Sequence, residues 1–335
     1  MSQSLEEFYR GRRVLVTGGL GFIGSNLAHR LVKLGSRVSI VDALVPSHGG
    51  SYRNIGGIED VVAVRVADMQ SPRVAKEAVA GQEVIFNLMG EVSHVDSMAN
   101  PRKDAEYNFL SHLSLLEACR RYNREAKVVY AGTRGQYGRP EYTPVDEGHP
   151  LRPIDVNGVN KQAAEGLHLV YHRAHGIRTV SLRLSNTYGP RQLMKHNRQG
   201  FIYWFVRQAL EGQTIVIYGD GSQLRDFVYV DDVVDAFLLA GAREAADGEA
   251  FNVGSGRPTS VLEAAKLVIE ACGRGGYRLM PFPEDRERIE IGDYYADTRK
   301  IERALGWRAC VPLREGMRRT VAFFAGSDRY WALDQ

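Results

Sequence analysis

Three glycines near the start of the chain have the spacing of a phosphate-binding loop. A run of apolar, β-branched residues ends at Thr17, and Gly18, Gly21 and Gly24 follow before a helix-like pattern begins. The first glycine permits a tight turn, the second lets a pyrophosphate approach the main chain, and the third allows close packing of helix on strand. The N-terminus of that helix offers free N–H groups to the phosphates. Glycine trios also occur in ordinary turns, so the surrounding residues must decide.

Asp42 is the residue that favours a dinucleotide. It follows the next apolar run, Arg37–Val41, close to the spacing of about 20 residues at which an acidic side chain meets the adenosine ribose. Because a carboxylate there repels a 2′-phosphate, Asp42 predicts NAD rather than NADP. An aspartate that only caps a turn is the alternative.

Two further polar residues stand where a substrate could react. Thr133 ends an apolar run that begins at Lys127, and its hydroxyl is suited to bond a substrate oxygen. A buried threonine bonded to its own backbone is the alternative. Lys161 lies in the first turns of a helix that begins after Pro153 and runs to about His175.

Alternating strands and helices must position these residues. We expect strands at Arg37–Val41, Val61–Val66, Glu83–Leu88 and Lys127–Ala131, helices at Ser71–Ala80 and Pro101–Tyr122, and a loop at Met89–Ser97. Repetition of this unit predicts an α/β fold with a parallel sheet, right-handed crossovers and helices on both faces. Ligands in such sheets lie beyond the carboxyl ends of the strands.

Composition narrows the class of protein. The chain has 335 residues, 44% of them hydrophobic, and a net charge of +3, which is too small and too dispersed to suggest a nucleic-acid or membrane surface. Cys119, Cys272 and Cys310 lie far apart, so we expect a reduced compartment and no metal site. The first 13 residues are polar and no run of about 18 apolar residues occurs, which favours a cytoplasmic protein.

With these motifs in place, nearly the whole sequence resembles the extended short-chain dehydrogenase/reductases, specifically the NAD-dependent nucleotide-sugar epimerases and dehydratases. Thr133, four residues before Tyr137, is similar to the active-site Ser or Thr of that family, and Lys161 to its catalytic lysine. The resemblance implies a Rossmann-type doubly wound parallel sheet with a smaller, discontinuous α/β substrate domain. It also implies these cofactor-binding residues: Gly18, Gly21, Phe22, Ile23, Gly24, Asp42, Asp68, Met69, Leu88, Met89, Gly90 and Lys161.

One position departs from the family pattern. The family places a tyrosine four residues before the lysine, and this chain has Asn157 there. The tyrosine accepts the substrate hydroxyl proton because a nearby ammonium lowers its pKa, whereas asparagine does not ionise near neutral pH. Other groups must then accept the proton. We favour a base from the loop that carries Glu91 and His94, or a water held by Thr133 and Asn157, with Asn157 orienting the sugar.

Further segments resemble those that hold the nucleotide diphosphate. These segments are Leu182–Pro190 and Tyr218–Phe227, and they imply Asn186, Tyr188 and Arg225 as substrate-binding residues. Arg288, or alternatively Arg286, is a further implied diphosphate ligand, and Thr133 is expected to bond a substrate oxygen. We expect an NAD domain of residues 1–185 with about 226–255, and a substrate domain of about 186–225 with 256–335. Helices are predicted in the substrate domain at Gly200–Leu210, Ser260–Cys272, Thr298–Leu305 and Leu313–Phe324.

The leading interpretation is an NAD-dependent enzyme that oxidises a ring carbon of a nucleotide-activated sugar transiently and then epimerises or dehydrates it. A catalytically silent protein that binds NAD and a nucleotide sugar is the main alternative, since Asn157 removes the usual base. A redox-sensing regulator on the same fold is a third, which has little reason to keep Thr133, Lys161 and Arg225 together. The resemblance also implies a homodimer built from the helices at Pro101–Tyr122 and Gly158–His175.

Overall fold

The computed structural model describes residues 4–46, 48–195, 200–283 and 290–326. Its centre is a seven-stranded sheet in which every neighbouring pair of strands is parallel. In spatial order the strands are β10 (Ala250–Val253), β6 (Thr179–Leu184), β5 (Lys127–Thr133), β4 (Val84–Asn87), β1 (Arg13–Thr17), β2 (Arg37–Asp42) and β3 (Ala63–Val66). The predicted doubly wound parallel sheet is thus confirmed.

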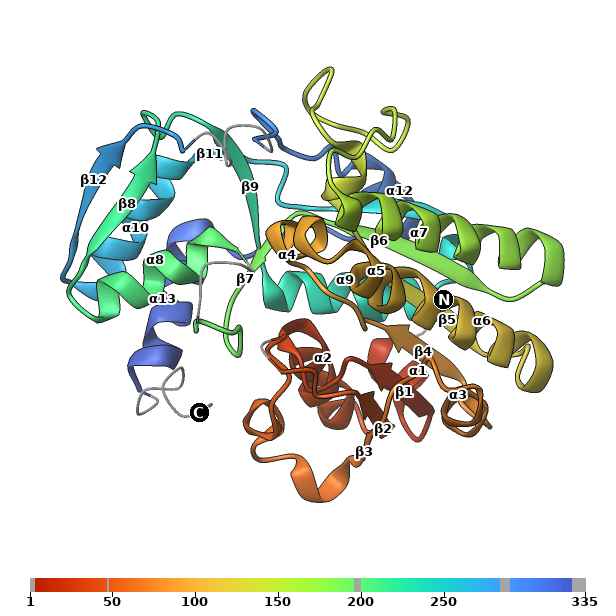
Figure 1. Ribbon diagram of the computed structural model, residues 1–335. Helices are drawn as coiled ribbons and strands as arrows, with labels where there is room; N and C mark the ends of the chain where they lie inside the picture. The colour runs from red at the N-terminus through yellow and green to blue at the C-terminus, as the bar shows by residue number, and fades with distance from the viewer. Residues whose placement is uncertain (1–3, 47, 196–199, 284–289, 327–335) are drawn as a thin grey trace.

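Helices cover both faces of this sheet (Figure 1). They are α1 (Leu5–Tyr9), α2 (Phe22–Lys33) and α9 (Val230–Ala242) on one side, and α3 (Pro72–Val79), α6 (Ser111–Tyr122) and α7 (Val156–His175) on the other. Alternate residues of a strand point to opposite faces, so β1 contributes to two cores. Val14 and Val16 pack with α2 and α9, and Leu15 packs in the core that includes Leu115 of α6.

The segment after β4 differs from the predicted loop. A short helix, α4 (His94–Ala99), begins there because the Ser93 hydroxyl caps it by accepting a hydrogen bond from the Asp96 amide. The predicted helix at Pro101–Tyr122 is present, but it consists of α5 (Pro101–Ala105), a π-helical turn η3 (Glu106–Leu110) and α6. The start of α4 places His94 above the carboxyl end of the sheet, facing α7.

The remaining elements gather at one end of the molecule (Figure 1). A three-stranded sheet contains β11 (Pro258–Ser260), β9 (Leu224–Tyr229) and β7 (Asn186–Tyr188), and a parallel pair contains β8 (Thr214–Tyr218) and β12 (Gly276–Met280). The helices here are α8 (Phe201–Leu210), α10 (Val261–Cys272) and α13 (Leu313–Ala325), while α12 (Arg299–Leu305) lies beside β10. The boundaries of the two predicted domains stay a prediction.

Candidate active site

The glycine loop connects β1 to α2 and forms a close-fitting turn. Gly18 has φ +68°, and a Cβ there would lie 2.7 Å from the carbonyl oxygen of Leu88. At Gly24 a Cβ would lie 2.3 Å from the Gly18 carbonyl oxygen, so only glycine lets the helix approach this strand. Gly21 caps α2 without a side-chain hydrogen bond and lines a cavity. This loop and helix N-terminus therefore fit a dinucleotide diphosphate.

Asp42 ends β2 beside this loop. Its carboxylate accepts hydrogen bonds from the backbone amides of Leu20 (3.0 Å) and Leu44 (2.9 Å). Burial raises its pKa, and the two amides oppose that rise. The carboxylate is thus held beside the cavity, where it suits a ribose diol. Asp68 and Met69 line the same part of the cavity.

The cavity has a volume of about 850 Å³ and extends from the glycine loop to the ends of β5 and β6. All twelve predicted cofactor residues line it, and so do Thr133, Asn157, His94, Asn186 and Arg225. The residues predicted for the cofactor and several of those predicted for the substrate therefore line one cavity. The reaction end, however, depends on contacts between side chains that are distant in the sequence.

Thr133 and Lys161 face this reaction end from β5 and α7. The Thr133 oxygen accepts a hydrogen bond from the Gly135 amide (3.1 Å), which leaves its O–H free to donate. Lys161 is buried, and desolvation lowers its pKa to about 8 although Asp104 and Glu91 oppose the shift. A Cβ added to Gly90 would lie 2.8 Å from the Lys161 Nζ, so the ammonium lies beside a glycine predicted to bind the cofactor.

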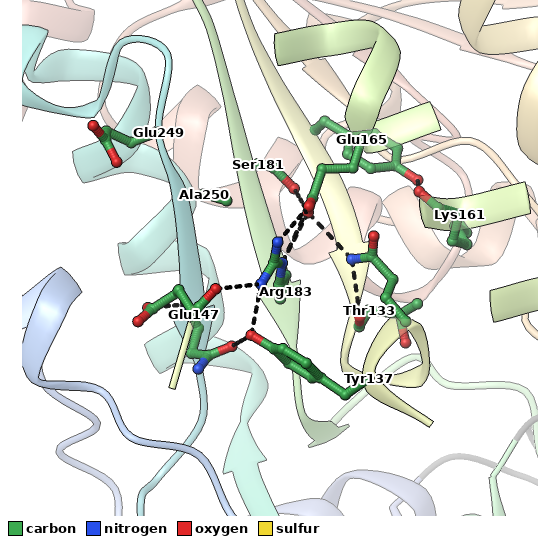
Figure 2. Close-up of polar contacts among 12 residues, drawn as sticks. Thr133, Tyr137, Glu147, Lys161, Glu165, Ser181, Arg183, Glu249 and Ala250 are labelled. Atoms are coloured by element: carbon green, nitrogen blue, oxygen red, sulfur yellow. Dashed lines mark hydrogen bonds and ion pairs between the residues drawn. The ribbon is translucent and has the colours of Figure 1, made fainter. Parts of the chain in front are cut away.

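A buried ion pair helps to link the helix that carries Lys161 to the strand that carries Thr133. Glu165, one helical turn after Lys161, binds the Arg183 guanidinium of β6 at 2.6 Å (Figure 2). The same carboxylate accepts a hydrogen bond from Gln136, whose amide also donates to the Thr133 carbonyl. Burial opposes ionisation of Glu165, but Arg183 outweighs it and lowers the pKa of the carboxyl. The helix with the lysine and the strand with the threonine are thereby linked.

Asn157 is anchored rather than free. Its amide nitrogen donates to the Glu91 carbonyl oxygen (2.8 Å) and to the Asp104 carboxylate (3.2 Å). Because both bonds use the NH₂ group, the amide oxygen is the atom left for the cavity. Asn157 therefore holds the loop after β4, and any contact with a sugar is as an acceptor.

Glu91 does not meet the requirements of the predicted base. One carboxylate oxygen accepts from the amides of Val92 and Ser93, and the other pairs with His48. Burial would raise its pKa, but these hydrogen bonds outweigh burial and lower it. Glu91 also does not line the cavity. We therefore remove it from the catalytic residues, since its carboxylate stabilises the start of the α4 segment.

His94 has the position and the partner that a base requires. Its Nδ1 lies 2.6 Å from the Asp155 carboxylate, which is 7% exposed, while the His94 ring is 43% exposed toward the cavity. A nitrogen this close to a carboxylate carries the proton, so Nε2 is left as the acceptor. A Cβ added to Gly135 would lie 3.5 Å from the Thr133 Oγ1 and 3.6 Å from the His94 Cε1. His94 and Thr133 therefore flank the same point of the cavity.

The predicted substrate ligands are only partly brought together. Arg225 lines the cavity, but its guanidinium pairs with Glu290 and donates to the Gly292 carbonyl oxygen. Tyr188 does not reach the cavity, because it is buried and its hydroxyl donates to the Leu313 carbonyl oxygen. It is therefore removed from the substrate-binding residues. Arg288 and Arg286 lie outside the described residues.

Sequence reasoning missed two residues of this site. Asp155 caps α7 by accepting from the Gly158 amide (2.7 Å), a role typical of aspartate before a helix, while its second oxygen holds His94. Arg134 follows Thr133 and lines the cavity. The signal for Arg134 was a charged residue directly after the expected hydroxyl; no local signal paired Asp155 with a histidine 61 residues away.

Comparisons with known proteins agree with this arrangement. A sequence profile described as "NAD dependent epimerase/dehydratase family" matches residues 14–254. The chain belongs to this family. It is 34% identical over 316 residues to UDP-glucose 4-epimerase of Mycolicibacterium smegmatis, covering 93% of this chain and 98% of that protein. It is 31% identical over 330 residues to dTDP-glucose 4,6-dehydratase of Actinoplanes sp., covering 95% of this chain and 99% of that protein.

A solved structure shows the same architecture. UDP-glucose 4-epimerase of Thermus thermophilus, in complex with NAD, matches with a TM-score of 0.84 and 33% identity over 94% of this chain and 99% of that chain. The predicted family, NAD cofactor and enzymatic character are thus confirmed. Within the described residues, no cluster of three metal-ligating side chains occurs. A search of the same part of the chain found no helix able to cross a membrane.

Proposed function

We propose that this member of the epimerase/dehydratase family acts on a nucleotide-activated sugar, by transient oxidation of a ring carbon followed by epimerisation or elimination. One observation carries the proposal: a single cavity joins the dinucleotide loop to Thr133, Lys161 and the His94–Asp155 pair. Bound NAD supplies an acceptor for the hydride and returns it later.

The chain's own side chains supply the proton chemistry. The Thr133 hydroxyl holds the sugar hydroxyl that loses its proton, and His94 Nε2 accepts that proton. Asp155, hydrogen-bonded to Nδ1–H, stabilises the imidazolium that forms and keeps the ring in the accepting tautomer. Lys161 binds the nicotinamide ribose, next to Gly90. The His94–Asp155 pair thereby replaces the tyrosine that the chain lacks.

The nucleotide diphosphate is assigned to Asn186 and Arg225. Both side chains line the cavity, Asn186 from the start of β7 and Arg225 from the start of β9. The Arg225 fork is suited to bidentate phosphate binding, and in the ligand-free protein Glu290 occupies part of it. Binding of the diphosphate therefore competes with Glu290.

We also infer a cytoplasmic homodimer. Val159 and Val170 of α7 are 51% and 45% exposed, and their spacing of 11 residues places them on one face of the helix. Leu110, at the end of η3 before α6, is a further exposed apolar side chain. Light scattering at micromolar concentration should give the mass of two chains, and replacing both valines by Glu should give one; a wild-type monomer contradicts this assembly.

The test of the main proposal is a panel of uridine and thymidine diphosphate sugars. We expect at least one to raise the melting temperature, to reduce bound NAD and to yield a product of altered configuration or of mass lowered by one water. If no nucleotide sugar gives product or cofactor reduction with wild type, while Asn157→Tyr gains activity, the chain is the silent binder instead.

A further inference from the structure

Arg134 is a cavity residue to which the proposed reaction assigns no task. It begins the 3₁₀ turn η4 (Arg134–Tyr137) directly after Thr133. Its Nε donates to the Asn186 side-chain oxygen (2.8 Å), and its guanidinium lies 5.3 Å from the centroid of the Tyr294 ring. The part of the chain that the structure describes offers no hydrogen-bond acceptor to its two terminal nitrogens. The hydrogen bond and the ring contact together position the guanidinium of this cavity-lining residue.

Two other arginines near this site show what Arg134 lacks. Arg183 is bound to Glu165, and Arg225 to Glu290. Arg134 has no carboxylate partner within the described ranges. Burial lowers its pKa to about 10, and the like charge of Arg225 adds to this effect. Arg134 is half-buried, and a charge partly removed from water without a counter-charge is costly, so an anion that enters the cavity gains a preformed partner.

The position of Arg134 favours an anionic group on the sugar over the nucleotide diphosphate. It is the chain neighbour of Thr133, and its charge interacts with Asp155, the carboxylate that holds His94. In the proposed reaction, Thr133 and His94 flank the sugar hydroxyl that reacts. The diphosphate already has Arg225 and the amide nitrogen of Asn186, whose oxygen is taken by Arg134. An anionic group on the sugar, close to the reacting hydroxyl, therefore fits Arg134 better than a phosphate.

We propose that Arg134 binds a carboxylate on the sugar, so that the substrate is a nucleotide-activated uronic acid. This inference rests on the proposed function and specifies its substrate class. A planar guanidinium with two free nitrogens matches the two oxygens of a carboxylate. A neutral hydroxymethyl group at the same place leaves the guanidinium without a counter-charge.

The experiment compares sugars that differ only in this group. Calorimetry of the NAD-loaded protein measures the affinity for glucuronate and glucose in both uridine and thymidine diphosphate form, and for the free nucleoside diphosphates. Wild type should bind the uronate form about 30-fold more tightly than the glucose form. Arg134→Gln should lose this preference, because affinity for the uronate forms falls far more than affinity for the glucose forms and free diphosphates, which also feel the lost hydrogen bond to Asn186. Arg134→Lys should keep part of the preference.

A matched control is Arg152→Gln, which removes an arginine whose side chain is 74% exposed and lies outside the cavity. It should leave all affinities unchanged. Equal binding of both sugars by wild type overturns the inference without any variant, even if Arg134→Gln fails to fold. Equal weakening of uronate, glucose and free diphosphate by Arg134→Gln assigns Arg134 to the diphosphate and also overturns it. If no diphosphate sugar binds wild type, the proposed function fails as well.

Discussion

The two ends of the cavity are built in different ways. At the cofactor end, backbone shape does most of the positioning: glycines at 18 and 24 allow a turn that a Cβ would block, and Asp42 is fixed by two backbone amides. At the reaction end, Thr133 and His94 depend on other side chains, through Gln136 and Asp155. The first arrangement positions a cofactor through the backbone, whereas the second positions reacting groups through side chains that are distant in the sequence. This difference predicts that substitutions at the two ends separate cofactor binding from turnover.

We expect the largest separation of turnover from cofactor binding in His94→Asn. Asparagine keeps a polar group but cannot accept a proton near neutral pH. Because general-base catalysis contributes about 10²–10⁴-fold, kcat should fall by that factor while the dissociation constant of NAD stays unchanged. Stopped-flow measurement of the reduction of bound cofactor tests the loss of rate, and calorimetry tests whether the dissociation constant of NAD is unchanged.

Two further variants test whether His94 rather than Glu91 is the base: Asp155→Asn removes the partner of His94, and Glu91→Gln is the matched control. Asp155→Asn should also lower kcat, because His94 loses the carboxylate that orients its ring and stabilises the imidazolium formed when it accepts the proton. Glu91→Gln should lower the melting temperature through loss of the His48 pair, with kcat within about tenfold of wild type. A large loss of kcat in Glu91→Gln, with full activity in His94→Asn, would reverse the assignment of the base.

Removal of Arg225 tests the nucleotide part of the reaction end. Arg225→Ala should weaken nucleoside diphosphate binding by about 2–5 kcal/mol, as for a truncated buried charge pair, and leave NAD affinity unaltered. Glu290→Gln should act in the opposite direction, because the diphosphate then no longer competes with a carboxylate for the same guanidinium. Calorimetry with UDP and dTDP distinguishes these outcomes. Unchanged affinity in Arg225→Ala would place the diphosphate elsewhere.

The same difference explains what could be predicted from sequence. Gly18, Gly24 and Asp42 act through local backbone geometry, so their spacing was sufficient to predict the dinucleotide loop. Lys161 and Thr133 were found through a family resemblance. By contrast, the sequence around Asp155 indicates only a helix cap. Its pairing with His94 arises only when α4 packs against α7. The helix at His94 was missed because the Ser93 cap stands in a short segment without apolar periodicity.

Asp42→Ala tests the cofactor end. The wild-type carboxylate accepts from Leu20 and Leu44 and is placed to accept from the ribose as well, so its loss should cost NAD about 1.5–3 kcal/mol. NADP should lose less, or even gain, because the repulsion of its 2′-phosphate disappears with the charge. Calorimetry with both cofactors measures the gap between them. Equal or tighter NADP binding by wild type would contradict the role of Asp42.

The smallest expected effect is a pH dependence of NAD binding that is caused by Lys161, which lies where the cofactor end and the reaction end of the cavity meet. Its pKa of about 8 means that the ammonium loses its proton as pH rises through 8 in the ligand-free protein. If the charged form binds the nicotinamide ribose, binding of NAD at higher pH must be accompanied by uptake of a proton from solvent by Lys161. The dissociation constant of NAD should then be flat below pH 8 and rise by up to about tenfold per pH unit above it, since one proton is involved.

Calorimetry between pH 6.5 and 9.5 in buffers of different ionisation enthalpy measures both the affinity and the proton uptake. Lys161→Met should bind NAD more weakly and without this pH dependence, because methionine keeps the apolar stem and removes the titrating group. Asp104 and Glu91 set the field around the ammonium, so Glu91→Gln should shift the onset to lower pH. A wild-type affinity that does not change across pH 8, with no proton uptake, would show that the Lys161 charge does not contribute to cofactor binding.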